Sequence, residues 1–102
     1  MQDCTRQWLE RINALYIRVK ESPLPDYDTI RDVLFDANAR TSTKERMLLA
    51  LVDHPDPDAT ALLQHQALSF DHRRLRFVHR LATRRRLRRC ALQTEVDHRQ
   101  AA

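Results

Sequence analysis

The chain has 102 residues, no glycine and a net charge of +4 at neutral pH. This length is that of one ordinary domain, which has room for one core but not for a roomy substrate cavity as well. The absence of glycine argues against β-hairpins with primed turns and against glycine-rich phosphate-binding loops. Apolar residues make up 42% of the chain and fall in periodic blocks, which a disordered chain would lack.

Apolar side chains recur at helical spacing from the start of the chain. Residues 3–20 place them on one arc, which predicts a first helix with that face in the core. Pro23 and Pro25 end this helix, because proline disfavours helical backbone in the residue before it. A second, short helix is expected after a cap at Asp26 or Asp28. Its apolar positions follow the i, i+3, i+4, i+7 pattern and are Ile30, Val33, Leu34 and Ala37.

Three further helices are expected in the second half of the chain. Ser42 and Glu45 have the spacing of a capping box, which opens a third helix through the apolar run 47–52. Six apolar residues in a row cover every direction of a helix, so this run predicts a central, buried element. A fourth helix is expected over about 58–68, with Ala67 facing inward. A long last helix begins near residue 72 and reaches the low nineties, with a frayed tail from about residue 95.

These elements define the predicted fold class, which is all-α. We expect a small bundle of four to five helices that includes a long basic C-terminal helix. The predicted division of the chain is a helical core domain at residues 1–83, followed by a basic helical arm and frayed tail at residues 84–102.

Charge is distributed unevenly along the chain. Residues 1–71 contain eight basic and twelve acidic side chains, a net charge of −4, whereas residues 72–102 contain ten arginines and two acids, a net charge of +8. Arginine supplies 16 of the 18 basic residues, and its planar guanidinium suits bidentate contacts with phosphate or carboxylate. An acidic body with a basic C-terminal helix indicates a binding function.

Within the last helix, the arginines fall in two groups when residues are stepped by about 100°. One group, together with Leu87, faces away from the apolar stripe. The other group lies at the angular positions that apolar side chains occupy one turn earlier in the helix. Three unpaired, buried guanidinium groups would be very costly, so the helix is expected to leave the body near residue 83–85, to kink, or to meet an acidic partner. The candidate partner- or phosphate-binding residues are therefore Arg73, Arg76, Arg80 and Arg84 in the outward row, Leu87 beside it, and Arg85, Arg88 and Arg89 on the apolar side.

Three interpretations of this basic helix remain open from the sequence. The arginines can form a solvated face or fold back onto the body's own acids, Asp28, Asp32, Asp36 and Asp53. They can engage another protein or a second copy of the chain, acid against base. They can also track a phosphate backbone.

The order of the helices at 47–52, 59–66 and 72–83 resembles a helix-turn-helix. The resemblance implies that residues 72–83 form the recognition helix in the DNA major groove. The stretch 48–55 is also similar to the first helix of winged-helix regulators. The sequence departs from the family pattern in three ways: the turn lacks glycine, Arg74 stands where an apolar residue is expected, and no wing sequence follows.

No catalytic, metal or cofactor site is predicted. None of the five histidines pairs with another at the i, i+4 spacing that places two imidazoles on one metal, and no nucleophile lies within a catalytic motif. Two cysteines, Cys4 and Cys90, are too few for the disulfide framework of a small secreted domain, so the cytoplasm is the expected compartment. The apolar run 47–52 is too short to span a membrane, and no apolar signal core is present.

The sequence therefore predicts a non-enzymatic protein-interaction module, such as a regulator, an adaptor or a chaperone-like protein. It would bind another protein, or a second copy as a homodimer, through its basic C-terminal helix and acidic body. The alternative is a nucleic-acid-binding transcriptional regulator of helix-turn-helix type that uses the arginine-rich helix at 72–90. No membrane, cofactor or small-molecule substrate is expected.

Overall fold

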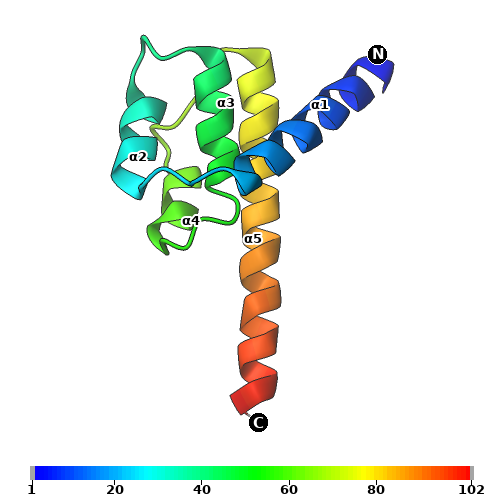
Figure 1. Cartoon of the computed structure of the whole chain (residues 1–102), viewed down its shortest axis with the longest axis vertical. Coiled ribbons are helices and arrows are strands. Elements are labelled where there is room, and N and C mark those ends of the chain that lie inside the picture. Colours follow the sequence, from blue (N-terminus) through cyan, green and yellow to red (C-terminus); the bar gives the residue numbers. More distant parts are fainter. Residues whose placement is uncertain (1, 102) are drawn as a thin grey trace.

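The computed structural model describes the backbone of residues 2–101 and the side chains of residues 4–94. Over this range the chain forms five α-helices and no strands, which confirms the predicted fold class (Figure 1). The helices are α1 (Gln2–Glu21), α2 (Tyr27–Phe35), α3 (Thr41–Ala50), α4 (Asp58–Leu63) and α5 (Arg73–Ala101). None of the described helices combines the length and the hydropathy needed to cross a membrane.

The centre of the core is α3 together with the turn that follows it. Helices α1, α2 and α5 all pack against α3, and the side chains of residues 48–52 are buried. The prediction that this apolar run is the central buried element is therefore confirmed. Burial of one such side chain stabilises the fold by about 1.5–3 kcal/mol, so this segment is a main source of stability.

The other helices each contribute a few side chains to the same core. Buried apolar residues from these helices are Ile12 from α1, Ile30 and Leu34 from α2, Ala59, Leu62 and Leu63 from α4, and Leu75, Val78 and Ala82 from α5. Trp8, Leu15, Tyr16 and Val19 of α1 pack half-buried against this cluster, so most of the apolar face predicted for the first helix lies against the core. Cys4 and Leu9, which the sequence also placed on that face, are exposed, and for them the prediction is wrong.

Three helices end earlier than the apolar pattern predicts, since α3 ends at Ala50 and not at Val52. Helix α2 ends at Phe35, because Asp36 takes an extended backbone and its carboxylate accepts a hydrogen bond from the Asn38 amide at 2.9 Å. Helix α4 ends at Leu63, and the Ala67 amide donates to Nδ1 of His65 at 3.1 Å. Ala37 and Ala67 are exposed, so both predictions of an inward alanine are wrong.

The predicted capping box at the start of α3 is also wrong. The N-cap is Arg40, which makes no side-chain capping bond, and Ser42 lies inside the first turn. Glu45 is only 5% exposed, and its Oε1 lies 2.9 Å from Nε of Arg74 on α5. The carboxylate thus forms a tertiary ion pair, which the local spacing of residues cannot reveal.

Helix α5 is longer than predicted and extends beyond the body. Its first half packs against α3 and α4, and its second half runs past the other helices into solvent (Figure 1). We expected fraying from about residue 95, whereas the backbone is helical through Ala101. The longest dimension of the molecule, 46 Å, follows this helix.

A candidate partner-binding surface on α5

Four arginines on the solvent side of α5 have no acidic partner among the described side chains. Arg76, Arg80, Arg84 and Arg88 are exposed, and none of them belongs to an ion pair within residues 4–94. Their regular spacing of four residues places them on adjacent turns of one helix face. We call this set the outer arginine face.

Leu87 lies on the same side of α5 as the outer arginine face. Its side chain is 41% exposed, and it follows Arg80 by seven residues, which is about two helical turns. Arg73, the first member of the predicted outward row, is exposed but has a partner, since its guanidinium lies 5.6 Å from the centre of the Trp8 ring on α1. The surface therefore combines unpaired cations with one large apolar side chain.

Arg85 turns towards the body. Its guanidinium donates to the side-chain oxygen of Asn13 and lies 5.3 Å from the centre of the Tyr16 ring. Both partners come from α1, where it crosses α5. A cation over an aromatic face is favourable, and burial beside the ring strengthens it. This arginine thus occupies an apolar angle of the helix without being left unpaired.

Arg89 also turns towards the body. Its Nε lies 3.2 Å from Oδ1 of Asp53, in the turn after α3. The other oxygen of Asp53 accepts a hydrogen bond from the Tyr16 hydroxyl. Burial, followed by the hydrogen bond to Asp53 and the charge of that carboxylate, raises the pKa of Tyr16 to about 12. Of the four acids expected as internal partners of the basic helix, Asp53 has this role, whereas Asp28 and Asp32 pair with Arg31 on their own helix.

The structure thus shows how α5 continues without a break past residue 83. Of the three outcomes expected for this segment, Arg85 and Arg89 meet polar and acidic partners of the same chain. Arg88, which the sequence placed on the apolar side, is instead exposed without an acidic partner among the described side chains. Arg85, Arg88 and Arg89 border one hollow of about 370 Å³ between α1, the α3–α4 turn and α5. Its remaining lining residues are Tyr16, Val52, Asp53, Leu92 and Gln93. Leu92 is 55% exposed at this hollow.

Arg86 is the residue of α5 that the sequence analysis missed. Its side chain is only 4% exposed, and it continues the buried stripe of Leu75, Val78 and Ala82. It donates 2.9 Å to Oγ1 of Thr60, 3.3 Å to the Leu51 carbonyl, 3.5 Å to that of Val52, 2.5 Å to that of His54 and 3.2 Å to that of Asp56. These carbonyls follow the end of α3, where helical partners run out. Extending the apolar stripe by one turn past Ala82 would have located this position.

The predicted division at residue 83 places Arg86 in the C-terminal arm, although its side chain is buried against the core. That division stays a prediction, but a deletion of residues 84–102 would remove a buried contact of the core. Point substitutions on the outer arginine face are therefore the better tool for testing function.

The connection between α4 and α5 bears on the helix-turn-helix resemblance. Residues 64–72 join the two helices, whereas a helix-turn-helix uses a turn of about three to four residues. The connection runs along the body, so α5 begins at the end of the helical body opposite α4 (Figure 1). Arg74, which occupies a position that is apolar in that family, pairs with the buried Glu45.

The described side chains hold no group of three or more histidine, cysteine or acidic residues placed to bind a metal. Cys4 is exposed, and Sγ of the half-buried Cys90 lies 3.6 Å from Oγ1 of Thr60.

Comparison with known proteins gives no relative: no family model, no curated protein and no solved structure matches the chain.

Proposed function

We propose that the chain is a non-enzymatic protein-interaction module that binds an acidic surface of another protein, or of a second copy, through the outer arginine face of α5. The observation that carries this proposal is that Arg76, Arg80, Arg84 and Arg88 are exposed on one helix without an acidic partner among the described side chains. The class of partner protein, its identity and a cytoplasmic location belong to the proposal as expectations.

The apolar side chains on and beside this face favour a protein over a phosphate backbone. Protein interfaces are enriched in arginine around a desolvated apolar centre, whereas phosphate contacts need cations and hydrogen-bond donors. Leu87 and Leu92 are 41% and 55% exposed. They can supply the apolar centre that a nucleic acid would not use. The surrounding guanidinium groups would then set specificity and the rate of association.

A second candidate function is nucleic-acid binding by the same arginines. The observation that favours it is the straight 29-residue helix that presents these cations on successive turns. Without the short turn of a helix-turn-helix, this candidate depends on backbone contacts alone, and it predicts binding without sequence preference.

The two candidates can be separated by titration of labelled probes with purified protein. One probe is a synthetic acidic peptide that contains leucine, and the other is a random DNA duplex. The triple variant R76E/R80E/R84E is expected to weaken peptide binding by at least about tenfold, because three attractive charges become repulsive. The matched control R11E/R40E reverses exposed arginines outside α5 and is expected to bind as the wild type does.

Leu87→Ala is the discriminating variant. Protein binding predicts weaker binding of the leucine-containing peptide and unchanged binding of the duplex. If the duplex binds more tightly than the peptide, with a steep salt dependence that the triple variant flattens, the nucleic-acid candidate replaces the protein one. If the partner is a second copy of the chain, light scattering over a range of concentrations should give a dimer mass for the wild type. R76E/R80E/R84E should then give the mass of the monomer.

A further inference from the structure

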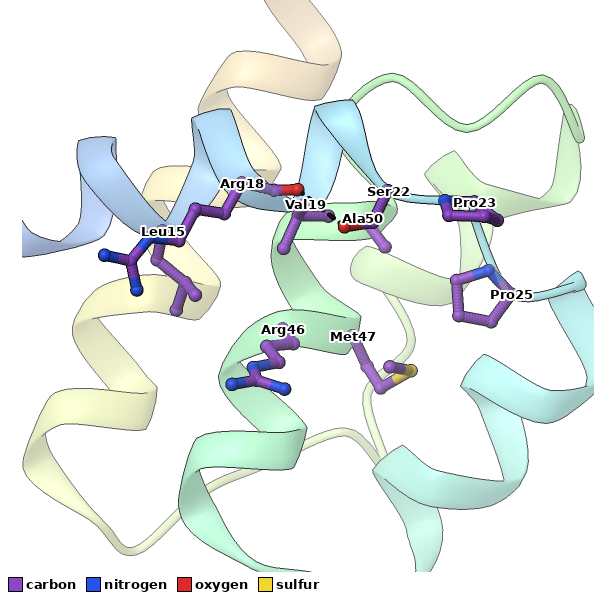
Figure 2. Close-up of a pocket in the computed structure, with 9 residues that line it drawn as sticks. All are labelled: Leu15, Arg18, Val19, Ser22, Pro23, Pro25, Arg46, Met47 and Ala50. Atoms are coloured by element: carbon purple, nitrogen blue, oxygen red, sulfur yellow. Dashed lines mark hydrogen bonds between the residues drawn. The ribbon is translucent and has the colours of Figure 1, made fainter.

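A second hollow lies away from the outer arginine face, between α1, the segment that follows it and α3. It has a volume of about 320 Å³, and Figure 2 shows the residues around it. Leu15, Arg18 and Val19 come from the C-terminal part of α1, Ser22, Pro23 and Pro25 from the linker to α2, and Arg46, Met47 and Ala50 from α3. Volumes of about 300–1,000 Å³ are typical of small-ligand sites, so this hollow has room for one or two large side chains.

Most of the lining of this hollow is apolar. Leu15, Val19 and Met47 are half-buried and pack against the core while part of each side chain stays accessible, and Pro25 is half-buried beside them. Met47 is unbranched and has three rotatable side-chain bonds, which lets it adapt to occupants of different shape. An apolar group that enters the hollow would therefore remove apolar surface from water on both sides of the contact.

Two guanidinium groups lie at one end of the hollow. Arg18 and Arg46 extend towards the same side, away from the two prolines (Figure 2). Both are exposed, and neither belongs to an ion pair among the described side chains. The hollow thus has an apolar floor and a cationic end, and it is complementary to an apolar group that lies beside carboxylates.

The backbone around the hollow offers little to an extended peptide. Pro23 and Pro25 have no N–H, and the Pro25 carbonyl already accepts a hydrogen bond from Nε2 of His54 at 2.9 Å. The Arg18 carbonyl accepts from the amide and the hydroxyl of Ser22. Addition of a strand needs free backbone donors and acceptors, so recognition here must use the side chains of the occupant.

We infer that this hollow is a second docking site, and that its occupant is an acidic amphipathic helix of a partner protein. One apolar side chain of that helix enters the floor formed by Leu15, Val19 and Met47. Carboxylates one turn away on the same face then meet Arg18 and Arg46, because residues three or four apart are neighbours on a helix. The site is independent of the outer arginine face and can be tested separately.

The test uses the full chain, labelled with nitrogen-15, and three short alanine-based helical peptides as probes. The first carries one leucine with two glutamates one turn away, the second replaces the glutamates by glutamine, and the third replaces the leucine by alanine. The first peptide is expected to shift amide signals of α1 and α3 that surround the hollow, and to bind at least about tenfold more tightly than either control.

Variants of the protein then assign the binding site. R18E/R46E is expected to weaken binding of the first peptide by at least about tenfold, whereas R11E/R40E reverses two other exposed arginines and is expected to leave it unchanged. R76E/R80E/R84E is also expected to leave the shifts around the hollow unchanged. If the wild type binds the first peptide at the hollow but binds no acidic peptide on α5, the proposed function is wrong and this site still stands.

Three results would overturn the inference. One is the absence of shifts around the hollow up to the solubility limit of the first peptide, and another is equal binding of the glutamine peptide. The third is self-association, seen as a mass that rises with concentration in light scattering and that R18E/R46E keeps at the monomer, together with no binding of the first peptide. This result would assign the hollow to a second copy of the chain.

Discussion

The two halves of α5 place different kinds of side chain against the core. In the first half, Leu75, Val78 and Ala82 bury an ordinary apolar stripe against α3 and α4. One turn later the stripe reaches Arg86, which is as buried as its apolar neighbours and is surrounded by carbonyl oxygens. A helix can therefore carry a guanidinium at a core position when the facing element ends there, because the end of a helix leaves carbonyls without partners.

The largest expected effect tests whether Arg86 is part of the core. Arg86→Ala would leave several buried carbonyls and the Thr60 hydroxyl without their donor, in addition to a cavity. We expect a loss of about 3–5 kcal/mol in the free energy of unfolding, measured by urea denaturation. Arg86→Lys is expected to recover only part of this loss, because an ammonium cannot reproduce the planar set of donors.

Val78→Ala is the matched substitution in the apolar half of α5. It removes two methyl groups from a fully buried side chain and is expected to cost about 1–2.5 kcal/mol. If Arg86→Ala proves no more destabilising than Val78→Ala, the carbonyl contacts contribute little, and the two halves of the helix do not differ as described.

A smaller effect is expected at the ion pair between α3 and the start of α5. Burial raises the pKa of Glu45, although the neighbouring Arg74 and His72 lower it. The unfavourable desolvation of the carboxylate therefore outweighs its attraction to Arg74. Glu45→Gln keeps an oxygen acceptor beside Arg74, whose side chain is 26% exposed and so remains partly hydrated. Stability at neutral pH is therefore expected to change by less than about 1 kcal/mol, or to increase.

The pH dependence of this group follows from the direction of its pKa shift. Because the folded state holds the Glu45 proton more tightly than the unfolded state does, the contribution of Glu45 to stability falls as pH rises from the unfolded pKa through the raised one. The wild type should therefore lose this contribution across the mildly acidic range, and Glu45→Gln should not. Denaturation at several pH values checks this, and the same pH dependence in both proteins would contradict it.

A further pH dependence of stability is expected from Tyr16, which lies beside Arg85 of α5 and donates to Asp53, the partner of Arg89. The pKa of Tyr16, raised to about 12, predicts that the folded protein loses stability as pH rises from about 10 to about 12, because the unfolded state releases this proton first. Ultraviolet absorbance of the phenolate should show the late titration, and Tyr16→Phe should remove it. Asp53→Asn is expected to lower the pKa of Tyr16, since the Asp53 charge is one of its causes.

The sequence predicted the helices and the centre of the core because these depend on local spacing. The apolar run of residues 47–52 is a property of neighbouring residues, and α3 with its following turn is buried as expected. The errors have a common cause: Glu45 was interpreted as a local cap, whereas its partner Arg74 is distant in the sequence. The ends of α2 and α4 were missed because Asp36 and His65 form turns where the apolar pattern continues.

The partners of the α5 arginines were only partly accessible to sequence analysis. The angular pattern separated Arg73, Arg76, Arg80 and Arg84 from the other arginines, and these four are exposed in the fold. The same pattern indicated that Arg85, Arg88 and Arg89 need partners, and Arg88 is instead exposed. Asn13 and Asp53, the partners of the other two, lie on elements whose positions only the fold supplies. Carbonyl acceptors such as those around Arg86 have no signal in the sequence, because every residue has one.

The smallest expected effect on stability separates the outer arginine face from the rest of α5. Arg84→Ala removes an exposed side chain with no ion pair among the described residues, so we expect a change of less than about 0.5 kcal/mol in urea denaturation. A slight gain is consistent with this, because Arg80 and Arg88 lie one turn away and repel it. A loss above about 1 kcal/mol would show that Arg84 supports the fold. In that case its charge would serve the fold and would not be free to bind a partner. If Arg84→Ala instead leaves stability unchanged and weakens binding of the acidic peptide, the outer arginine face acts in binding and not in folding.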